Sequence, residues 1–357
     1  MRPPECVLVR LGEIALKSPQ VQRRMFGMLL GNMRAALEGL EYDMETNPNR
    51  IFIYTKRIDE AIERIKKIFG VTSVSPCWTC FSGLNDIRML ASDIASDVLK
   101  LGEKDSFAIR AHRVGRHKFS SKEVAEEAGA AVKRVTGASV ELSKPDREIF
   151  IEARSRKTYV FVDKFSGAGG MPVGTAGKII SPVENPADAA AAWLMMKRGC
   201  EVLVLVDEEN NRLAEILKEW DAQMATAVYD GRIMESFLSD IPADEKYAAG
   251  KLLLAKIASL AAEKEGALGI SSGTASNASL GFIGQVNKMS AVPVYMPLQL
   301  YPEKELKAIM KLMGIKAKPT KEKLHEIELE KISAGIENAA EQMLKSVQEE
   351  KIEHEEG

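Results

Sequence analysis

The first 80 residues alternate short apolar runs with amphipathic stretches. Strands are expected where apolar residues follow or alternate with one another, and helices where they recur every three to four positions. In chain order the pattern predicts a strand at 6–9, a helix at 20–40, strands at 41–46 and 51–55, a helix at 59–69 and a strand at 71–74. This βαββαβ order is typical of the split-βαβ, ferredoxin-like fold.

A second small module follows in residues 85–162. Its predicted elements are helices at 86–101 and 121–135, a strand at 107–111, and a hairpin that pairs 149–151 with 159–161. Helices and strands of this kind in a short segment predict an α+β module.

After Gly177 the pattern changes to longer helices separated by short, wholly apolar runs. Strands are predicted at 179–180, 201–206, 268–270 and 292–295, and helices over the alanine-rich segment that ends near Lys197 and at 212–227, 245–264 and 303–313. Continuous apolar strands that alternate with helices predict an open, doubly wound α/β sheet. Ligands of such sheets bind beyond the carboxyl ends of the strands, which directs attention to residues 183–188 and 271–274.

The last segment, residues 316–357, is predicted to be a charged helix that ends in a frayed tail. One stripe of this helix is apolar and is expected to pack against the rest of the chain or a partner helix; it contains Leu329, Ile332, Ile336, Ala340, Met343 and Val347. The four patterns predict domains at 1–80, 81–170, 171–315 and 316–357. The glycine-dense residues 167–174 at the second boundary are interpreted as a shaped turn and not as a flexible linker.

Composition places the chain among globular proteins of two or three domains. It has 357 residues, of which 45% are hydrophobic and 28% charged, as is usual for a soluble protein. No apolar run reaches the roughly 18 residues of a membrane-spanning helix, and the N-terminus does not resemble a signal peptide. We therefore expect a cytoplasmic protein without a membrane partner.

Four cysteines are too few and too scattered for a disulfide framework. Only Cys77 and Cys80 have the spacing of a metal or redox pair, and without a second pair they are interpreted as small buried residues. No metal site is predicted.

Charge is unevenly distributed along the chain. Residues 1–177 carry 28 Lys and Arg against 22 Asp and Glu, whereas residues 178–357 carry 21 against 29. In the first half one short stretch is dense in cationic side chains, namely Arg110, His112, Arg113, Arg116, His117 and Lys118. We interpret this stretch as a contact for the phosphates of a nucleic acid, and the alternative is a solvated loop.

Several motifs, in order and with matching spacing, resemble the tRNA 4-thiouridine synthases, which are tRNA sulfurtransferases also linked to thiamine thiazole biosynthesis. The matching stretches are Arg10-Leu-Gly-Glu-Ile-Ala-Leu-Lys17, Ile68-Phe-Gly-Val71, Val140-Glu-Leu-Ser-Lys-Pro-Asp146, the glycine-rich 167–177, Leu194-Met-Met-Lys-Arg-Gly199 and Pro297-Leu298 with Glu303-Lys-Glu305. The resemblance covers residues 5 to 315.

The resemblance implies a ferredoxin-like N-terminal domain, a THUMP domain and a PP-loop ATP-pyrophosphatase domain. The first two domains of such proteins grip the acceptor region of tRNA, and the third adenylates a uridine oxygen before sulfur is delivered to that carbon. Under this resemblance the expected tRNA-binding residues are Lys17, Arg110, Arg113, Arg116, His117, Lys118, Arg154, Arg156 and Lys157.

The chain departs from the family where the phosphates of ATP should bind. The family's Ser-Gly-Gly-x-Asp-Ser motif aligns with Val183-Glu184-Asn185-Pro186-Ala187-Asp188. The two glycines would let backbone N–H groups approach a pyrophosphate, but Glu184 adds a carboxylate and Pro186 lacks an N–H donor. If each lost donor costs about 3 kcal/mol, two losses weaken transition-state stabilisation roughly ten-thousandfold. The degenerate nucleotide site is predicted to contain Val183, Glu184, Asn185, Asp188, Ser272 and Gly273.

A second departure concerns the cysteine that carries sulfur in the family. It is expected late in the PP-loop domain, yet no cysteine follows Cys200, which begins an apolar strand and is predicted to be buried. No catalytic residue is therefore assigned, and whether the chain is an enzyme stays open.

Three hypotheses follow. The leading one is a tRNA-binding family member with an impaired adenylation site. It presents tRNA to an active sulfurtransferase or sulfur-donor protein, or it competes with an active relative. A homodimer is a further predicted assembly. The second is a working sulfurtransferase that uses ATP and Mg²⁺, with Asp188 and Ser272 near the phosphates and Cys77 or Cys80 as the sulfur carrier. The third is a sensor that binds a small anion or nucleotide without chemistry.

Overall fold

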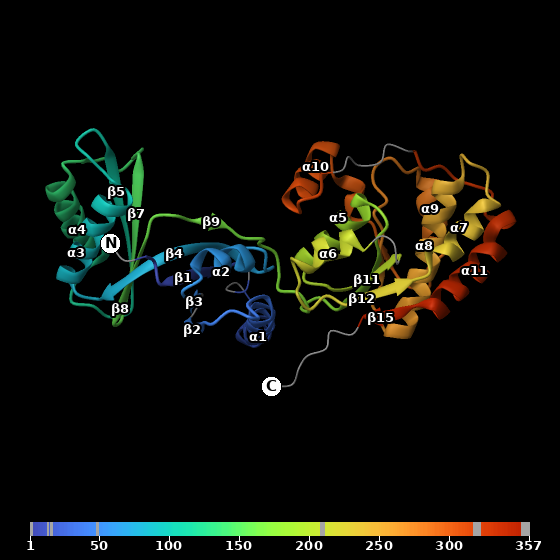
Figure 1. The fold of residues 1–357 in the computed structure, drawn as a ribbon, viewed down its shortest axis with the longest axis horizontal. Helices are drawn as coiled ribbons and strands as arrows, with labels where there is room; N and C mark the ends of the chain where they lie inside the picture. Colours follow the sequence, from blue (N-terminus) through green and yellow to red (C-terminus); the bar gives the residue numbers. More distant parts are fainter. Residues whose placement is uncertain are drawn as a thin grey trace. The chain divides into compact units, whose positions relative to one another are not determined.

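The computed structural model describes residues 3–12, 14, 17–47, 50–207, 211–316 and 323–350, and the side chains of all of these except 348–350. The chain divides into two compact units (Figure 1). Unit 1 comprises residues 1–15, 37–67 and 71–168, and unit 2 comprises residues 16–36, 68–70 and 169–357. None of the described helices is both long and apolar enough to cross a membrane.

Unit 1 is built on a nine-stranded sheet, as far as its described residues show. The strand order is β2-β3-β1-β4-β8-β7-β5-β6, and β9 also pairs with β4. The strands are β1 (Cys6–Leu11), β2 (Asp43–Asn47), β3 (Arg50–Tyr54), β4 (Val71–Phe81), β5 (Ser106–Val114), β6 (Ser139–Val140), β7 (Arg147–Arg154), β8 (Lys157–Phe161) and β9 (Phe165–Ser166).

The long strand β4 holds this sheet together. Its first part pairs with β1 and its last four residues pair with β8. The sequence predicted a strand at 71–74 only, so this prediction was too short. The missed part contains alternately directed side chains: Cys77 packs with Cys6 and Phe52 on one face, while Trp78 packs with the helices on the other face.

Helices cover the second face of the unit 1 sheet. They are α2 (Ile58–Ile65), α3 (Leu84–Asp93) and α4 (Ser121–Thr136). Helix α3 continues as a π-helical turn, η2 (Ile94–Val98), and α2 packs on β1 and β4. Helix α4 begins at a capping box formed by Ser120 and Glu123 and ends at Gly137 in the left-handed conformation. These caps satisfy terminal backbone groups that would otherwise lack partners.

Unit 2 is an open α/β sheet with the order β14-β13-β10-β11-β12-β15. Its strands are β10 (Lys178–Pro182), β11 (Glu201–Asp207), β12 (Thr226–Tyr229), β13 (Ile270–Ser271), β14 (Val294–Tyr295) and β15 (Gln348–Glu350). All pair in parallel except β15, which is antiparallel to β12. The predicted doubly wound sheet is confirmed.

Helices lie on both faces of this sheet (Figure 1). One group contains α5 (Pro186–Lys197), α6 (Arg212–Lys218) and α10 (Glu303–Leu312) with the short helix η4 (Pro297–Leu300). The other group contains α7 (Gly231–Ser239), α8 (Lys246–Glu265), α9 (Leu280–Lys288) and α11 (Leu329–Ser346). Helix α1 (Pro19–Ala36) also belongs to unit 2, where the Asn32 side chain donates to the carbonyl of Val173 at 3.2 Å.

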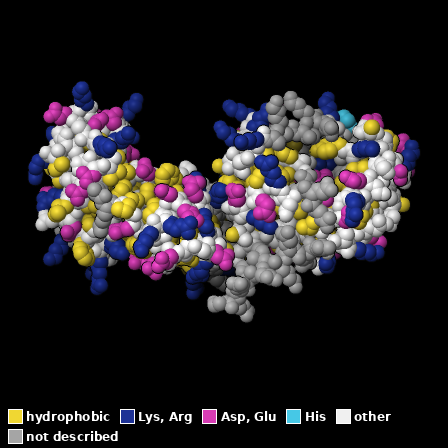
Figure 2. Space-filling view, viewed as in Figure 1, with side chains coloured by type: hydrophobic (Ala, Val, Ile, Leu, Met, Phe, Trp, Pro, Cys, Tyr) yellow, Lys and Arg dark blue, Asp and Glu magenta, His cyan; other side chains and the backbone are white. Residues whose placement is uncertain are grey.

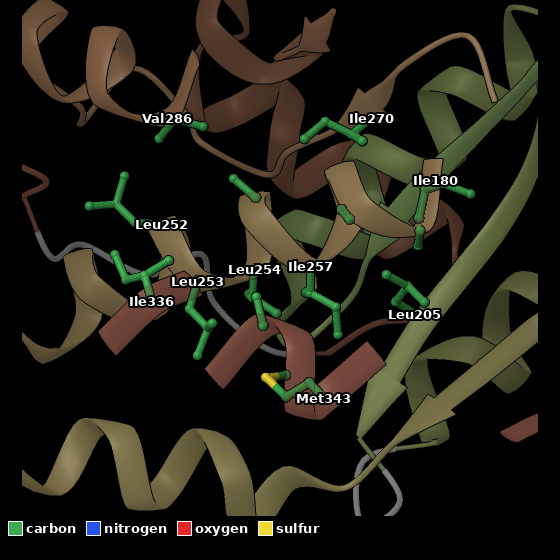
Figure 3. Packing of buried hydrophobic residues seen from close by; sticks show 14 of the residues in the cluster. Ile180, Leu205, Leu252, Leu253, Leu254, Ile257, Ile270, Val286, Ile336 and Met343 are labelled. Carbon is green, nitrogen blue, oxygen red and sulfur yellow. The ribbon is translucent and has the colours of Figure 1, made fainter. Parts of the chain in front are cut away.

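Helix α8 is the core of unit 2. Nearly all of its residues from Ala248 to Ala262 are buried, as expected for a core helix, and it packs against β10, α7, α9 and α11. Figure 3 shows Leu252, Leu253 and Ile257 of α8 among side chains from the sheet and from α11. The predicted stripe of the C-terminal helix is confirmed at its centre, because Ile336, Ala340 and Met343 are buried in this cluster.

Two secondary-structure predictions for unit 2 were wrong. Residues 212–227 do not form one helix: α6 ends at Lys218, and β12 begins at Thr226. Of the described residues in the predicted C-terminal helix, only those of α11 are helical, and β15 follows them. The sequence also gave no prediction of α7 or α9, and the predicted fraying of the last residues lies outside the described residues.

The glycine-dense segment approaches helix α5 closely. Gly169 and Gly170 both have positive φ, of 65° and 72°. A Cβ atom at Gly170 would overlap the carbonyl of Lys197, whereas a Cβ atom at Gly169 would meet nothing within 4 Å.

Substitution by alanine is expected to reduce stability by different amounts at Gly169 and at Gly170. Gly169→Ala is expected to lower the free energy of unfolding by about 1 kcal/mol, the cost of the left-handed backbone. Gly170→Ala should lower it by roughly 3 kcal/mol or more, because a backbone clash is added. Urea unfolding of the two variants measures both values, and equal losses would contradict the close approach.

Candidate nucleotide site and basic surface

The carboxyl edge of the unit 2 sheet contains the point at which the strand order reverses. From β10 the chain passes through α5 to β11 on one side, while β13 lies on the other side of β10. All three strands are parallel, so they end at one edge, after Pro182, Asp207 and Ser271. In open α/β sheets ligands bind in the crevice at such a switch point.

Helix α5 begins at this crevice with a cap from its own side chains. The Asn185 carboxamide oxygen accepts the N–H groups of Ala187 at 2.9 Å and Asp188 at 3.2 Å. The Asp188 carboxylate in return accepts the N–H groups of Asn185 and Glu184, both at 3.3 Å. Pro186 has no N–H. The donors that a helix N-terminus offers to an anion are thus used within the chain.

Asp188 also forms a buried ion pair with Lys251 of α8. The Nζ atom lies 2.6 and 2.8 Å from the two carboxylate oxygens, and the side chains of Lys251 and Asp188 are only 4% and 2% exposed. Burial lowers the pKa of Lys251, but Asp188, with Tyr247 and Glu184, outweighs burial and holds this pKa above its ordinary value. Lys251 therefore stays protonated and paired.

The loop after β13 closes the site. The Gly273 N–H donates to Asp188 at 3.1 Å, and a Cβ atom at Gly273 would overlap the backbone nitrogen of Asp188. The described residues Pro182, Asp188, Lys251 and the start of this loop line a cavity of about 10 Å³, which is near the lower limit for one water molecule.

Glu184 adds a second carboxylate to the crevice. Burial raises its pKa to about 7, and the charges of Asp188 and Asp207 contribute in the same direction. The Tyr229 hydroxyl donates to Glu184 at 3.3 Å. When it is ionised, the Glu184 carboxylate opposes the binding of a polyphosphate at this edge, whereas the charge of Asp188 is balanced by Lys251.

The structure brings five of the six predicted nucleotide-site residues to one place. Glu184, Asn185, Asp188 and Gly273 are joined by hydrogen bonds, and Ser272 lines the small cavity. Val183 instead extends the sheet, since its N–H donates to the Leu205 carbonyl at 2.8 Å. The described residues at this crevice do not fit ATP with Mg²⁺, because their backbone donors are occupied within the chain and the cavity that they line is small. Among the described residues, no group of three or more His, Cys, Asp or Glu is arranged to hold a metal ion.

Sequence reasoning missed Lys251, although a signal was available. A lysine within the apolar run of residues 248–255 requires a buried partner, because an unpaired charge is not stable in an apolar core.

Unit 1 gathers the predicted basic residues at one edge of its sheet. Strands β5 and β7 are parallel, with Val114 opposite Arg154, so the loop after β5 lies beside the turn after β7. Arg113, Arg116, Lys118 and Arg156 are exposed there. Figure 2 shows Lys and Arg side chains projecting from this end of unit 1, with Asp and Glu side chains beside them.

Other members of the predicted set are engaged within the protein. Arg110 binds Glu148 at 2.7 Å, Arg154 binds Glu152 at 2.7 Å, and Lys157 donates to the Tyr54 hydroxyl at 2.9 Å. His117 contacts the Val114 carbonyl at 3.1 Å. Lys17 is exposed just before α1, in unit 2.

Unit 1 also contains a cleft that the sequence did not predict. Its volume is about 890 Å³. It combines aromatic, basic and acidic side chains with one thiol, and its lining includes Tyr42, Tyr54, Phe81, Lys56, Arg156, Lys157, Glu5, Glu41, Asp43, Asp86 and Cys80.

The two closely spaced cysteines lie on opposite faces of β4. Cys77 is buried with Cys6, and burial raises the pKa of its thiol far above the ordinary value. Cys80 is half-buried and borders the cleft. This geometry agrees with the interpretation of the pair as packing residues, because side chains three positions apart on a strand cannot share a ligand. Burial also raises the pKa of Cys200.

Comparison with known proteins identifies both front modules. A model of the ThiI ferredoxin-like domain matches residues 6–75, and a model of the THUMP domain matches residues 82–163. The ferredoxin-like and THUMP predictions are therefore confirmed.

Relatives and solved structures match most of the chain. A probable tRNA sulfurtransferase of Methanothermobacter thermautotrophicus is 34% identical over 87% of this chain and 85% of its own length. Another, of Thermococcus kodakarensis, is 31% identical over 86% and 87%. The structure of PH1313 from Pyrococcus horikoshii is 26% identical with a TM-score of 0.72, covering 87% of this chain and 100% of that one. The structure of a 4-thiouridine synthetase–RNA complex with bound ATP has a TM-score of 0.79 and 20% identity, covering 97% and 99%, which shows the fold.

The raised pKa of Glu184 predicts a pH-dependent stability. Because the folded protein binds this proton more tightly than the unfolded chain, stability is lost as pH rises from the ordinary carboxyl pKa through about 7. Glu184→Gln should remove this loss and raise the free energy of unfolding at pH 8 by roughly 2 kcal/mol, with little change at pH 5.

Urea unfolding at a series of pH values, followed by tryptophan fluorescence, measures the effect. Exposed Glu235→Gln on α7 is the matched control and should leave the pH profile unchanged. Parallel profiles for the wild-type protein and Glu184→Gln would show that Glu184 is not perturbed.

Proposed function

The chain belongs to the tRNA sulfurtransferase family, and from this premise we propose that it binds tRNA without carrying out ATP-dependent adenylation. The observation that carries the proposal is the occupied crevice of unit 2. There the carboxylate of Asp188 pairs with Lys251 and accepts hydrogen bonds from the N–H groups of Gly273, Glu184 and Asn185.

The basic edge of unit 1 supports the RNA-binding part of the proposal. Arg113 near the end of β5, Arg116 and Lys118 in the loop after β5, and Arg156 in the turn after β7 are exposed at one edge of the sheet. Exposed cations contact phosphates and position a nucleic acid. The neighbouring cleft contributes Tyr42, Tyr54 and Phe81, and Phe81 is 80% exposed. Aromatic rings of this kind stack on unpaired bases.

The energetics of the crevice support the absence of adenylation. A triphosphate would have to separate Asp188 from Lys251, and separating a buried pair costs roughly 3–5 kcal/mol. It would also approach Glu184, whose carboxylate is ionised above about pH 7. Neither cost is offset by free backbone donors, because the cap of α5 uses them.

The second candidate function is ATP-dependent formation of 4-thiouridine in tRNA. Identity of 34% over most of a probable tRNA sulfurtransferase favours it. This function requires the crevice to open on ATP binding and a thiol to carry sulfur. Of the four cysteines, all of which are described, Cys80 is the half-exposed one.

The first test concerns the basic edge. The triple variant Arg113→Ala, Arg116→Ala, Lys118→Ala should bind tRNA at least about tenfold more weakly at moderate salt, because phosphate contacts are lost. The slope of log affinity against log salt should decrease by about 1 for each lost contact. Filter binding at several salt concentrations measures both quantities.

The control is Lys133→Ala with Arg134→Ala at the opposite end of α4, where both side chains are exposed. It should retain the wild-type affinity. Equal losses in the two variants would contradict a specific role of the edge after β5.

The second test concerns the crevice. We expect the wild-type protein mixed with tRNA, ATP, Mg²⁺ and sulfide to bind tRNA but to release no pyrophosphate above background. Direct titration should give an ATP dissociation constant weaker than ~1 mM. Pyrophosphate release that depends on tRNA, together with 4-thiouridine in the product, would establish the second candidate.

A further inference from the structure

We propose that Asp188 is an internal ligand whose carboxylate occupies an oxyanion cradle and keeps phosphate groups out of it. The inference deepens the proposed function, on which it rests, by naming the contact that closes the adenylation site. Removal of this one carboxylate should then let the crevice bind a small oxyanion.

The donors around Asp188 converge from three separate segments. Lys251 comes from α8, Gly273 from the loop after β13, and the N–H groups of Glu184 and Asn185 from the loop after β10. A cation and several backbone N–H groups aimed at one point form the arrangement that binds phosphate or a developing oxyanion. Here the two oxygens at that point belong to the protein.

The charge of the crevice depends on Asp188. With Asp188 present, the positive charge of Lys251 is balanced by the carboxylate. Without it, a buried ammonium and three N–H groups lose their acceptor, which is costly unless another anion replaces it. The other groups that face this place are Glu184, Asp207, Tyr229 and Tyr247.

A purely structural role predicts a different outcome. If Asp188 only fastens α5 to α8, its removal destabilises unit 2, and no anion repairs the damage specifically. The distinction therefore requires a comparison of anions at matched ionic strength, and a variant that lacks the cation.

The experiment measures the melting temperature of four proteins in chloride and in inorganic phosphate at pH 6 and matched ionic strength. The proteins are the wild type, Asp188→Ala, Asp188→Asn and the double variant Asp188→Ala with Lys251→Met. Phosphate should raise the melting temperature of Asp188→Ala by about 3 °C more than that of the wild type. The double variant should show no more than the wild-type response, since it lacks Lys251.

Asp188→Asn keeps the shape of the side chain and guards against failure of Asp188→Ala to fold. It should respond to phosphate more than the wild type does, because Lys251 loses its counter-charge, but less than Asp188→Ala, because the carboxamide still fills part of the cradle. Equal responses to phosphate in the wild type and in both single variants would overturn the inference, as would a response of the double variant equal to that of Asp188→Ala.

Failure of this inference is separable from failure of the proposed function. Tight ATP binding by the wild-type protein would remove the proposed function. Absence of a phosphate response in the single variants, with tRNA binding retained and ATP binding absent in the wild type, would remove only the role of Asp188 as an internal ligand.

Discussion

The buried contact between Asp188 and Lys251 is the constraint on which unit 2 depends. It joins the start of α5 to the core helix α8, and through Gly273 it also holds the loop after β13. The same contact lies at the switch point of the sheet, where proteins of this architecture bind ligands. Stability and ligand binding therefore compete for the same donors, and in this chain the carboxylate of Asp188 takes them.

In unit 1, some cationic side chains are held in ion pairs within the protein and others are exposed. Glu148, Glu152 and Glu45 engage Arg110, Arg154 and Lys157, which fixes these cations within the sheet and its cleft. The cations on the loop after β5 remain exposed. The excess of positive charge in residues 1–177 is thus a poor guide to individual contacts, because the fold decides which carboxylate each cation meets. Arg110 pairs with a residue of the neighbouring strand, Arg154 with one on its own strand, and Lys157 of β8 with one on β2. The proposed RNA contacts rest on position at the sheet edge and not on the count of charges.

Much of the fold was predictable because its local signals agree. The βαββαβ order, the hairpin of β7 and β8, and the apolar strand β11 follow from hydrophobic periodicity alone. The prediction failed where local and tertiary preferences differ. Residues 224–227, Met-Ala-Thr-Ala, suit a helix by composition, yet Thr226 and Ala227 pair with β11 because the sheet has an open position there. The length of β4 was likewise decided by pairing with β8 across the middle of the sheet.

For the candidate site, the sequence by itself determined that residues 183–188 lack the glycines of the family motif and come before an alanine-rich helix. Only the tertiary structure decided that the carboxylate of Asp188 meets Lys251, which lies 63 positions away in the chain. That meeting depends on α8 packing against β10 and on β13 returning beside it. A cap is a local hydrogen-bond pattern, whereas the partner of a buried charge is set by which distant elements share its low-dielectric surroundings.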